Sequence, residues 1–505
     1  KVTEKFFCKE NNINKVNDFI ESITKKERAC RSMKILIMSN LFPKDIVEQL
    51  DRYVIGQKEA KRVVAVALRN RYRRSQLPKA VADEITPKNI IMKGPTGVGK
   101  TEIARRLSKL VGAPFIKVEA TKYTEVGYVG RDVESMIRDL MAVGYKMVKS
   151  EMQEDLRVKA EEKVEDALLD LLLPGSGKDT KKKKTFFGMG QAPVQNPENL
   201  PAENEADKGN MAETREKFRT MLREGKLEDR TVEVVASRGN KMPTFEIFAG
   251  GNMEDMESAM QGIATMLSGP RSSKKNVTIA EARKIILEEE LDKMTDPDKV
   301  AEEARNRVQE MGIIFIDEID KIAAKGSGSG GQDVSREGVQ RDILPIVEGS
   351  NVNTKFGVID TTHILFIAAG AFNVSKPSDL IPELQGRFPL RVELESLSAE
   401  DFKRILTEPK NALTKQYTSL LETEDVTIKF TDEAIDRLSS LAADVNQKVE
   451  NIGARRLHTI METLLEDLSF EADEHAGETI EITASYVDEK LKDVVQNQDL
   501  SKYIL

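Results

Sequence analysis

Short apolar runs alternate with amphipathic segments along much of the chain. Four largely apolar runs have the length of buried strands, and they lie at residues 89–92, 115–118, 313–316 and 364–367. Between the first two, Ile103, Leu107 and Leu110 recur at the spacing of one helix face. This strand–loop–helix–strand order predicts a parallel sheet covered by helices, which is the arrangement of an α/β fold.

The other periodic segments have the spacing of helices. They are predicted at residues 45–50, 58–74, 145–172, 213–224 and 278–311. Residues 175–210 show no period and are rich in Lys, Pro and Asn, so we expect this stretch to be disordered. From residue 397 onward the chain is mostly helical, and it opens with Ser398 and Asp401 in a capping-box pattern.

These elements predict an α/β core that is interrupted by an insertion. The core takes residues 38–146 and 292–396, the inserted helical intermediate domain takes 147–291, and a smaller, mostly helical C-terminal domain takes 397–505. Residues 1–37 form an atypical N-terminal extension whose apolar patch is too short for a secretory signal. We expect the natural start at Met38, with a native regulatory extension as the alternative.

Composition excludes several classes of chemistry. The 85 acidic and 77 basic residues leave a net charge of −8, which argues against binding nucleic acid by bulk charge. Cys8 and Cys30 cannot staple 505 residues, and the three histidines show no metal-ligand spacing. No apolar run has the length of a membrane span. We therefore expect a reduced, soluble, cytoplasmic protein.

A run of arginines marks the basic helix at residues 58–74. Arg69, Arg71, Arg73 and Arg74 fall within six positions of each other. Such a run is more often a solvated helix face than a functional basic patch, so we expect these side chains to be exposed.

The segment at residues 94–101, GPTGVGKT, fits the phosphate-binding P-loop and lies between a predicted strand and a predicted helix. Its glycines let backbone N–H groups turn toward a phosphate, and the helix N-terminus adds partial positive charge. Lys100 is expected to reach the β- and γ-phosphates, and the Thr101 hydroxyl to hold Mg²⁺. The expected nucleotide contacts in this segment are Gly97, Val98, Gly99, Lys100, Thr101 and Glu102.

Two acids follow the apolar run at residues 313–316. Asp317 is the candidate for positioning Mg²⁺ through its water shell, and Glu318 is the candidate for polarising an attacking water. Alone, the pair could be solvated acids at a strand end, but beside a P-loop it predicts ATP hydrolysis. Two arginines, Arg387 and Arg455, could complete the site, although spacing alone fits surface ion pairs equally well.

With these motifs the chain resembles the AAA+ ATPases of the Clp/Hsp100 class from about residue 38 to residue 505. The resemblance rests on the P-loop, on residues 127–130, 315–320, 333–342 and 383–387, and on residues 502–505. It implies a homo-hexamer with ATP between subunits, in which Arg387 would be an arginine finger and Arg455 a sensor-2 arginine. Ile55 would pack on the adenine, and Glu383 would be a further nucleotide-site residue.

The resemblance also implies a way of handling protein substrates. Gly127, Tyr128, Val129 and Gly130 would form a pore loop that grips an extended chain, whereas spacing alone favours a partly buried tyrosine turn. The terminal Tyr503, Ile504 and Leu505 would dock on a dodecameric partner peptidase. One departure concerns residues 368–370, Ala-Ala-Gly, where many AAA+ proteins carry a polar sensor-1 residue.

The sequence therefore favours an ATP-dependent unfoldase that translocates proteins through a hexamer pore into a separate peptidase. A stand-alone remodelling chaperone and, less favoured, a nucleic-acid motor ATPase remain as alternatives. No peptidase constellation is visible in the chain itself.

Overall fold

The computed structural model describes residues 42–82, 84–124, 131–173, 205–236, 273–323, 332–448 and 451–492. The chain divides into two compact units, residues 1–147 with 301–505, and residues 148–300. The N-terminal extension, the pore-loop motif at 127–130 and the terminal residues 503–505 lie outside the described residues. None of the described helices is long and apolar enough to span a membrane.

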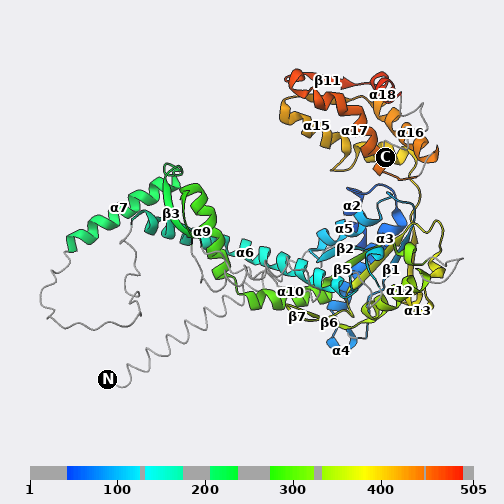
Figure 1. Ribbon diagram of the computed structural model, residues 1–505, viewed down its shortest axis with the longest axis horizontal. Coiled ribbons are helices and arrows are strands. Elements are labelled where there is room, and N and C mark those ends of the chain that lie inside the picture. Colours follow the sequence, from blue (N-terminus) through cyan, green and yellow to red (C-terminus); the bar gives the residue numbers. More distant parts are fainter. Residues whose placement is uncertain are drawn as a thin grey trace, which may run out of the picture. The chain divides into compact units, whose positions relative to one another are not determined.

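A five-stranded parallel sheet organises the first unit (Figure 1). Its order is β2-β5-β8-β1-β9, with bounds β1 Ile90–Lys93, β2 Phe115–Glu119, β5 Ile313–Asp317, β8 Leu365–Gly370 and β9 Leu390–Glu393. All six residues of β8 and the first four of β5 are buried, as expected of central strands covered on both faces. The predicted parallel α/β fold is thus confirmed.

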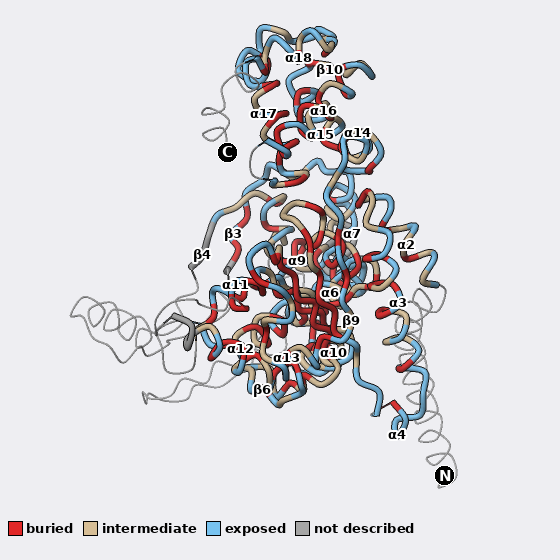
Figure 2. The backbone as a smooth tube through the Cα atoms, turned by 90° about the vertical axis from the view of Figure 1, so that its right-hand side faces the viewer, coloured by how far each residue is buried: buried red, intermediate tan, exposed pale blue. Residues whose placement is uncertain are grey.

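Helices pack on the sheet and supply the rest of its core. Figure 2 shows buried backbone concentrated on the central strands. The helices and hairpin of this part are α2 Pro43–Asp51, α3 Lys58–Ser75, α4 Lys79–Ala82, α5 Lys100–Val111, η1 Ala120–Lys122, α10 Pro297–Met311, α11 Ile319–Ile322, α12 Gln332–Glu348, β6 Asn351–Thr354, β7 Gly357–Asp360, η2 Pro377–Asp379 and α13 Pro382–Arg387. Apolar residues of α2, α3 and α5 form one cluster with strands β1, β5, β8 and β9.

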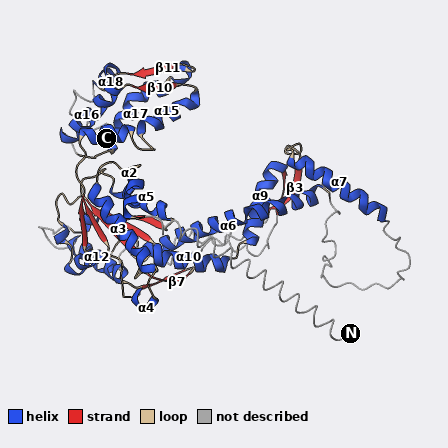
Figure 3. Cartoon of the chain, turned by 180° about the vertical axis from the view of Figure 1, so that it is seen from behind, coloured by secondary structure: helices blue, strands red, loops and turns tan. Residues whose placement is uncertain are grey.

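The C-terminal part of the first unit has its own core of buried residues between Phe402 and Leu491. Its elements are α14 Ala399–Thr407, α15 Leu413–Leu421, η3 Glu422–Glu424, β10 Thr427–Phe430, α16 Asp432–Lys448, α17 Arg455–Phe470, η4 Ala472–His475, β11 Thr479–Ile482 and α18 Ala484–Lys490 (Figure 3). The predicted capping box is confirmed, since Ser398 Oγ accepts from the Asp401 amide at 3.2 Å and Asp401 Oδ2 accepts from the Ser398 amide at 3.0 Å.

The second unit is built on long helices and a small sheet. Its elements are α6 Ser135–Leu172, which begins in the first unit, α7 Glu205–Arg223, β3 Thr231–Ala236, β4 Ser273–Thr278 and α9 Ile279–Met294. The antiparallel β3–β4 pair was not predicted. The disorder prediction for residues 175–210 was wrong at its end, because α7 already begins at Glu205.

The exposed-face prediction for the arginine run was wrong for Arg71 and Arg74. Arg71 donates to the carbonyl oxygens of Glu310, Met311, Gly312 and His363 at 2.6 to 3.2 Å. Burial lowers the pKa of its guanidinium to about 10. Arg74 is buried and pairs with Glu310 at 2.8 Å. Both side chains thus fasten the end of α10 to α3.

Candidate nucleotide site

The P-loop connects β1 to α5, where the sequence predicts it. Gly97 and Gly99 adopt left-handed backbone conformations, with φ of 74° and 97°, which glycine tolerates best. Lys100 begins α5 and is 9% exposed, and its ammonium donates to the carbonyl oxygens of Gly94 at 2.5 Å and Pro95 at 2.7 Å. The carbonyls of the loop itself thus hold this ammonium.

Burial lowers the pKa of the Lys100 ammonium. Asp317 and Asp320 oppose this effect by favouring the charged form, whereas Arg455 adds to it. Asp317 and Arg455, which the sequence assigned to the nucleotide site, therefore both act on this lysine. Asp320 was not among the predicted residues, although it is buried and its carboxylate would lie 2.7 Å from a Cβ on Gly370, at the end of β8.

Strand order explains why the acidic pair lies at this edge. The carboxyl ends of parallel strands lie at the same edge of the sheet. Only β8 separates β1, which leads into the P-loop, from β5, which leads into the acidic pair. Asp317 ends β5 and its Oδ1 accepts from the Glu318 amide at 3.0 Å. Glu318 has a left-handed φ of 57°, uncommon for a residue with a side chain, and its carboxylate accepts from the Thr121 hydroxyl at 3.4 Å.

Lys117 is a site residue that sequence reasoning missed. Its ammonium lies 2.8 Å from Asp317 Oδ2, and the two side chains are 32% and 18% exposed. Lys117 belongs to β2, next to β5 in the sheet, with Glu119 in register with Asp317. A cross-strand partner of this kind could be found only once the strand pairing was known.

A second close approach brings α17 to the P-loop. The Ala454 amide donates to Gly97 O at 3.1 Å. A Cβ on Gly97 would lie 2.0 Å from Ile452 O, and one on Gly453 would lie 2.5 Å from Thr96 O, so both positions require glycine. Arg455, the first residue of α17, is thereby held beside Lys100.

The segment containing Ile55 lies against the same loop. Ile55 and Val54 are buried, and a Cβ on Gly99 would lie 3.2 Å from Val54 Cγ1. Val54 O accepts from the buried Lys61 ammonium, which also pairs with Asp51 at 2.6 Å. This segment is therefore held next to the phosphate loop.

Glu102 was predicted to contact the nucleotide, but its carboxylate pairs with arginines of its own helix. Its carboxylate accepts from Arg106 Nε at 2.6 Å and lies 3.7 Å from Arg105, both on its own helix. Any contribution of Glu102 to nucleotide binding therefore rests on its backbone rather than on its carboxylate.

Arg387 and Glu383 lie at the other edge of the sheet. Both belong to α13, which leads into β9, and Ile90 at the start of β1 is in register with Leu390 at the start of β9. Arg387 O accepts from Asn89 Nδ2 at 3.1 Å, just before β1, whereas the P-loop follows the end of β1. The structure thus does not bring Arg387 to the P-loop of its own chain, and its guanidinium pairs with Glu348 at 2.9 Å.

The donor set at the P-loop edge suits Mg²⁺. Thr101 and Asp317 offer a hydroxyl and a carboxylate, the hard oxygen donors that Mg²⁺ prefers alongside phosphates and waters. Among the described residues no group of three or more His, Cys, Asp or Glu side chains could hold a metal by itself. That is the composition expected where a nucleotide brings its own metal.

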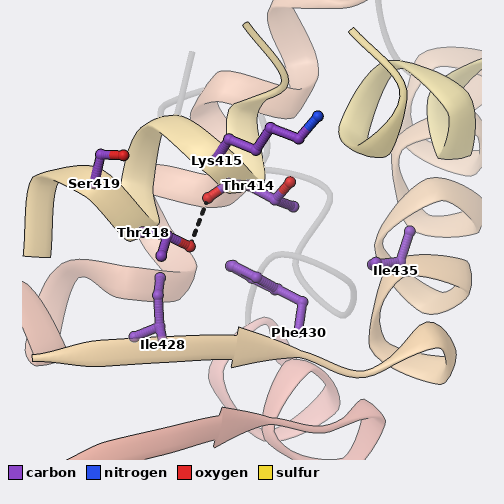
Figure 4. A pocket seen from close by; sticks show the side chains of 7 residues that line it. All are labelled: Thr414, Lys415, Thr418, Ser419, Ile428, Phe430 and Ile435. Carbon is purple, nitrogen blue, oxygen red and sulfur yellow. Dashed lines mark hydrogen bonds between the residues drawn. The ribbon is translucent and has the colours of Figure 1, made fainter. Parts of the chain in front are cut away.

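One cavity of about 330 Å³ lies elsewhere, in the C-terminal part (Figure 4). Its lining residues come from α15, β10 and α16, and they are Thr414, Lys415, Thr418, Ser419, Ile428, Phe430 and Ile435. None of these residues belongs to the nucleotide site described above.

A parallel sheet with a P-loop on one strand and an acidic pair at a neighbouring strand end defines a P-loop ATPase of the AAA class. Two family models agree: one described as "AAA domain (dynein-related subfamily)" matches residues 89–160, and one described as "AAA domain (Cdc48 subfamily)" matches residues 240–391. The predicted AAA+ fold and ATPase activity are confirmed.

Comparison with similar proteins identifies the family within the AAA class. The chain is 67% identical to the "ATP-dependent protease ATPase subunit HslU" of Treponema denticola, over 93% of this chain and 99% of that protein. Proteins with the same name from Maridesulfovibrio salexigens and Persephonella marina are 56% and 53% identical, each over 93% of this chain and all of the relative. The chain belongs to the HslU family of ATPase subunits. Neither a stand-alone chaperone nor a nucleic-acid motor is favoured by these relatives.

Proposed function

We propose that this chain hydrolyses ATP to unfold proteins and translocate them through a homo-hexameric pore into an HslV-like peptidase dodecamer. The observation that carries the proposal is a P-loop lysine and an acidic strand-end pair at one sheet edge, within a chain 67% identical to an ATPase subunit of an ATP-dependent protease. We assign peptide cleavage to the partner, since the relatives are named as the ATPase subunit of an ATP-dependent protease.

The residues of the site divide the chemistry among them. Lys100 releases the carbonyls of Gly94 and Pro95 and binds the β- and γ-phosphates together with the N-terminus of α5. Thr101 and Asp317 would hold Mg²⁺, which when bound neutralises charge on the phosphates. Glu318 accepts a proton from the water that attacks the γ-phosphate.

Two arginines complete the site from different chains. Arg455 contacts the phosphates of its own subunit, because α17 is held against the P-loop through Gly97 and Gly453. Arg387, at the sheet edge opposite its own P-loop, serves the nucleotide of a neighbouring subunit. Glu383 shares α13 with Arg387 and would act at the same neighbouring site. This division makes hydrolysis depend on ring assembly.

Substrate handling and docking fall to segments outside the described residues. Tyr128 and Val129, between Gly127 and Gly130, would grip substrate in the pore, and Tyr503, Ile504 and Leu505 would anchor the ring to the peptidase. We place the protein in the cytoplasm, acting on proteins and not on nucleic acid or membranes.

Mass measurement of the full chain with ATP, alone and with an HslV-like dodecamer, tests the assembly. The expected species are a hexamer and a hexamer–dodecamer complex. Deleting residues 503–505 should remove only the second species, and Ser501→Ala serves as a control in the same tail. A complex that survives the deletion would place docking elsewhere on the chain.

A further inference from the structure

The carboxylate assigned to Mg²⁺ already has a cationic partner. Asp317 Oδ2 lies 2.8 Å from the Lys117 ammonium, while its Oδ1 accepts from the Glu318 amide. Both oxygens of this side chain are therefore engaged by groups of its own chain. We infer that Lys117 is a positioning residue that competes with Mg²⁺ for Asp317, so that the metal binds well only when nucleotide accompanies it.

Sheet topology places Lys117 on one side of Asp317 and the P-loop on the other. β2, which carries Lys117, is the outermost strand beside β5, whereas β1 lies beyond β8 on the opposite side. Lys117 therefore flanks Asp317 from the side away from Lys100. It orients the carboxylate without standing in the phosphate path.

Because Asp317 is largely buried, its ion pair with Lys117 has a stronger electrostatic effect than most surface ion pairs. Asp317 is only 18% exposed, so water screens its charges less than at the open surface. A resident unit charge beside the carboxylate disfavours the approach of a divalent cation by direct repulsion. The phosphates of ATP supply the negative charge that outweighs this repulsion, which couples metal occupancy to nucleotide occupancy.

The ion pair with Lys117 also fixes the orientation of the Asp317 carboxylate. Asp317 ends a strand, where its side chain could otherwise rotate toward solvent. The Lys117 ammonium and the Glu318 amide hold its two oxygens in one orientation. Glu318 follows directly in the chain, so this hold also bears on the residue proposed to activate water.

The inference rests on the proposed Mg²⁺ role of Asp317, and the experiment separates the two. Binding of a fluorescent ATP analogue to the full chain is measured at a series of Mg²⁺ concentrations. Lys117→Met should lower the Mg²⁺ concentration for half-maximal binding by about three- to tenfold, whereas Lys117→Arg should keep the parental value. Lys149→Met is the matched control, because it removes another 2.8 Å lysine–aspartate pair, with Asp292, in the other unit.

Asp317→Asn supplies the internal check. It should abolish the Mg²⁺ dependence of binding, and adding Lys117→Met to it should then have no further effect. If Asp317→Asn left the Mg²⁺ dependence intact, the metal assignment itself would be wrong. If Asp317→Asn abolished it but Lys117→Met left the requirement unchanged or raised it, only the role of Lys117 would fail.

A direct phosphate contact by Lys117 is the competing explanation. In that case Lys117→Met would weaken binding of the analogue even without Mg²⁺, a result that would overturn the inference. Lys117→Gln repeats the test with a polar neutral side chain, and thermal melting of each variant verifies that the chain is folded.

Discussion

At the scale of single residues, the site depends on close backbone approaches that few side chains allow. Gly453 has a left-handed φ of 61°, and a Cβ there would lie 2.5 Å from Thr96 O and 2.7 Å from the Gly97 carbonyl carbon. These contacts hold Arg455 next to the phosphate loop. Adding a single methyl group at Gly453 should therefore weaken nucleotide binding.

Gly453→Ala is predicted to weaken ATP binding by about tenfold or more, because the clash moves α17 and Arg455 away from the P-loop. Gly112→Ala is the matched control: Gly112 has a nearly identical φ of 62°, and a Cβ there meets nothing within 4 Å. Both variants carry left-handed strain of about 1–2 kcal/mol. Equal loss of nucleotide affinity in the two variants would contradict the assigned contact.

Glu318→Gln is predicted to retain ATP binding while lowering turnover by about a hundredfold or more, since the amide cannot accept the proton of the attacking water. Nucleotide affinity and steady-state phosphate release are the two measurements. Glu393→Gln, at the end of β9, removes an exposed strand-end carboxylate of the same sheet and should leave both unchanged. Near-normal turnover in Glu318→Gln would remove this residue from its role.

The sequence could predict the positions of residues that belong to a motif with a fixed place relative to a strand. Lys100, Asp317 and Glu318 follow strands recognisable from apolar runs, so their meeting at one sheet edge could be foreseen. Lys117 and Arg71 could not, because their partners lie 200 or more positions away in the chain. A lone Lys or Arg at such a position looks like any solvated residue.

At the scale of elements, buried runs were predicted and short mixed strands were missed. β5 and β8 are nearly continuous apolar stretches, whereas β9 reads Leu-Arg-Val-Glu and only its Val392 is buried. β10 and β11 have the same length of four residues with polar positions between apolar ones. These strands exist because a neighbouring strand pairs with them, which a local pattern cannot show.

The contact between α3 and α10 leads to a prediction about stability. Arg71→Met should lower the free energy of unfolding of the first unit by about 3 kcal/mol, because four backbone carbonyls lose their buried donor. Arg73→Met is the control on the same helix, since Arg73 is exposed and donates to Asn70. Thermal and urea unfolding measure both, and a loss in Arg71→Met no larger than in Arg73→Met would contradict the assigned role.

At the scale of the whole molecule, the sheet separates Arg387 from the P-loop of its own chain. Lys100 and Glu318 lie where the strands end, and Arg387 lies where β9 begins. Under the proposed function, a complete site therefore needs a second copy of the chain. The proposed homo-hexamer would supply that second copy, and the position of α13 gives a physical reason for it.

Mixing two inactive variants tests this division directly. Arg387→Ala should bind ATP yet lose about a thousandfold in turnover, and Glu318→Gln should also be impaired in turnover, for a different reason. Mixed rings should regain hydrolysis, because an Arg387→Ala subunit keeps its Glu318 and receives an arginine from a Glu318→Gln neighbour. Arg391→Ala, four residues further along the chain and within β9, is the control. Mixtures as inactive as their components would show that Arg387 serves its own subunit.

The central claim is that ATP hydrolysis by this chain delivers folded proteins to a separate peptidase. The most direct measurement is degradation of a stably folded protein by the full chain with an HslV-like dodecamer and Mg²⁺-ATP. We predict degradation that stops with Glu318→Gln, and with Tyr128→Ala while ATP hydrolysis continues. Degradation that proceeds without hydrolysis, or a folded protein left intact while the peptidase cleaves unfolded chains and ATP is consumed, would contradict the account.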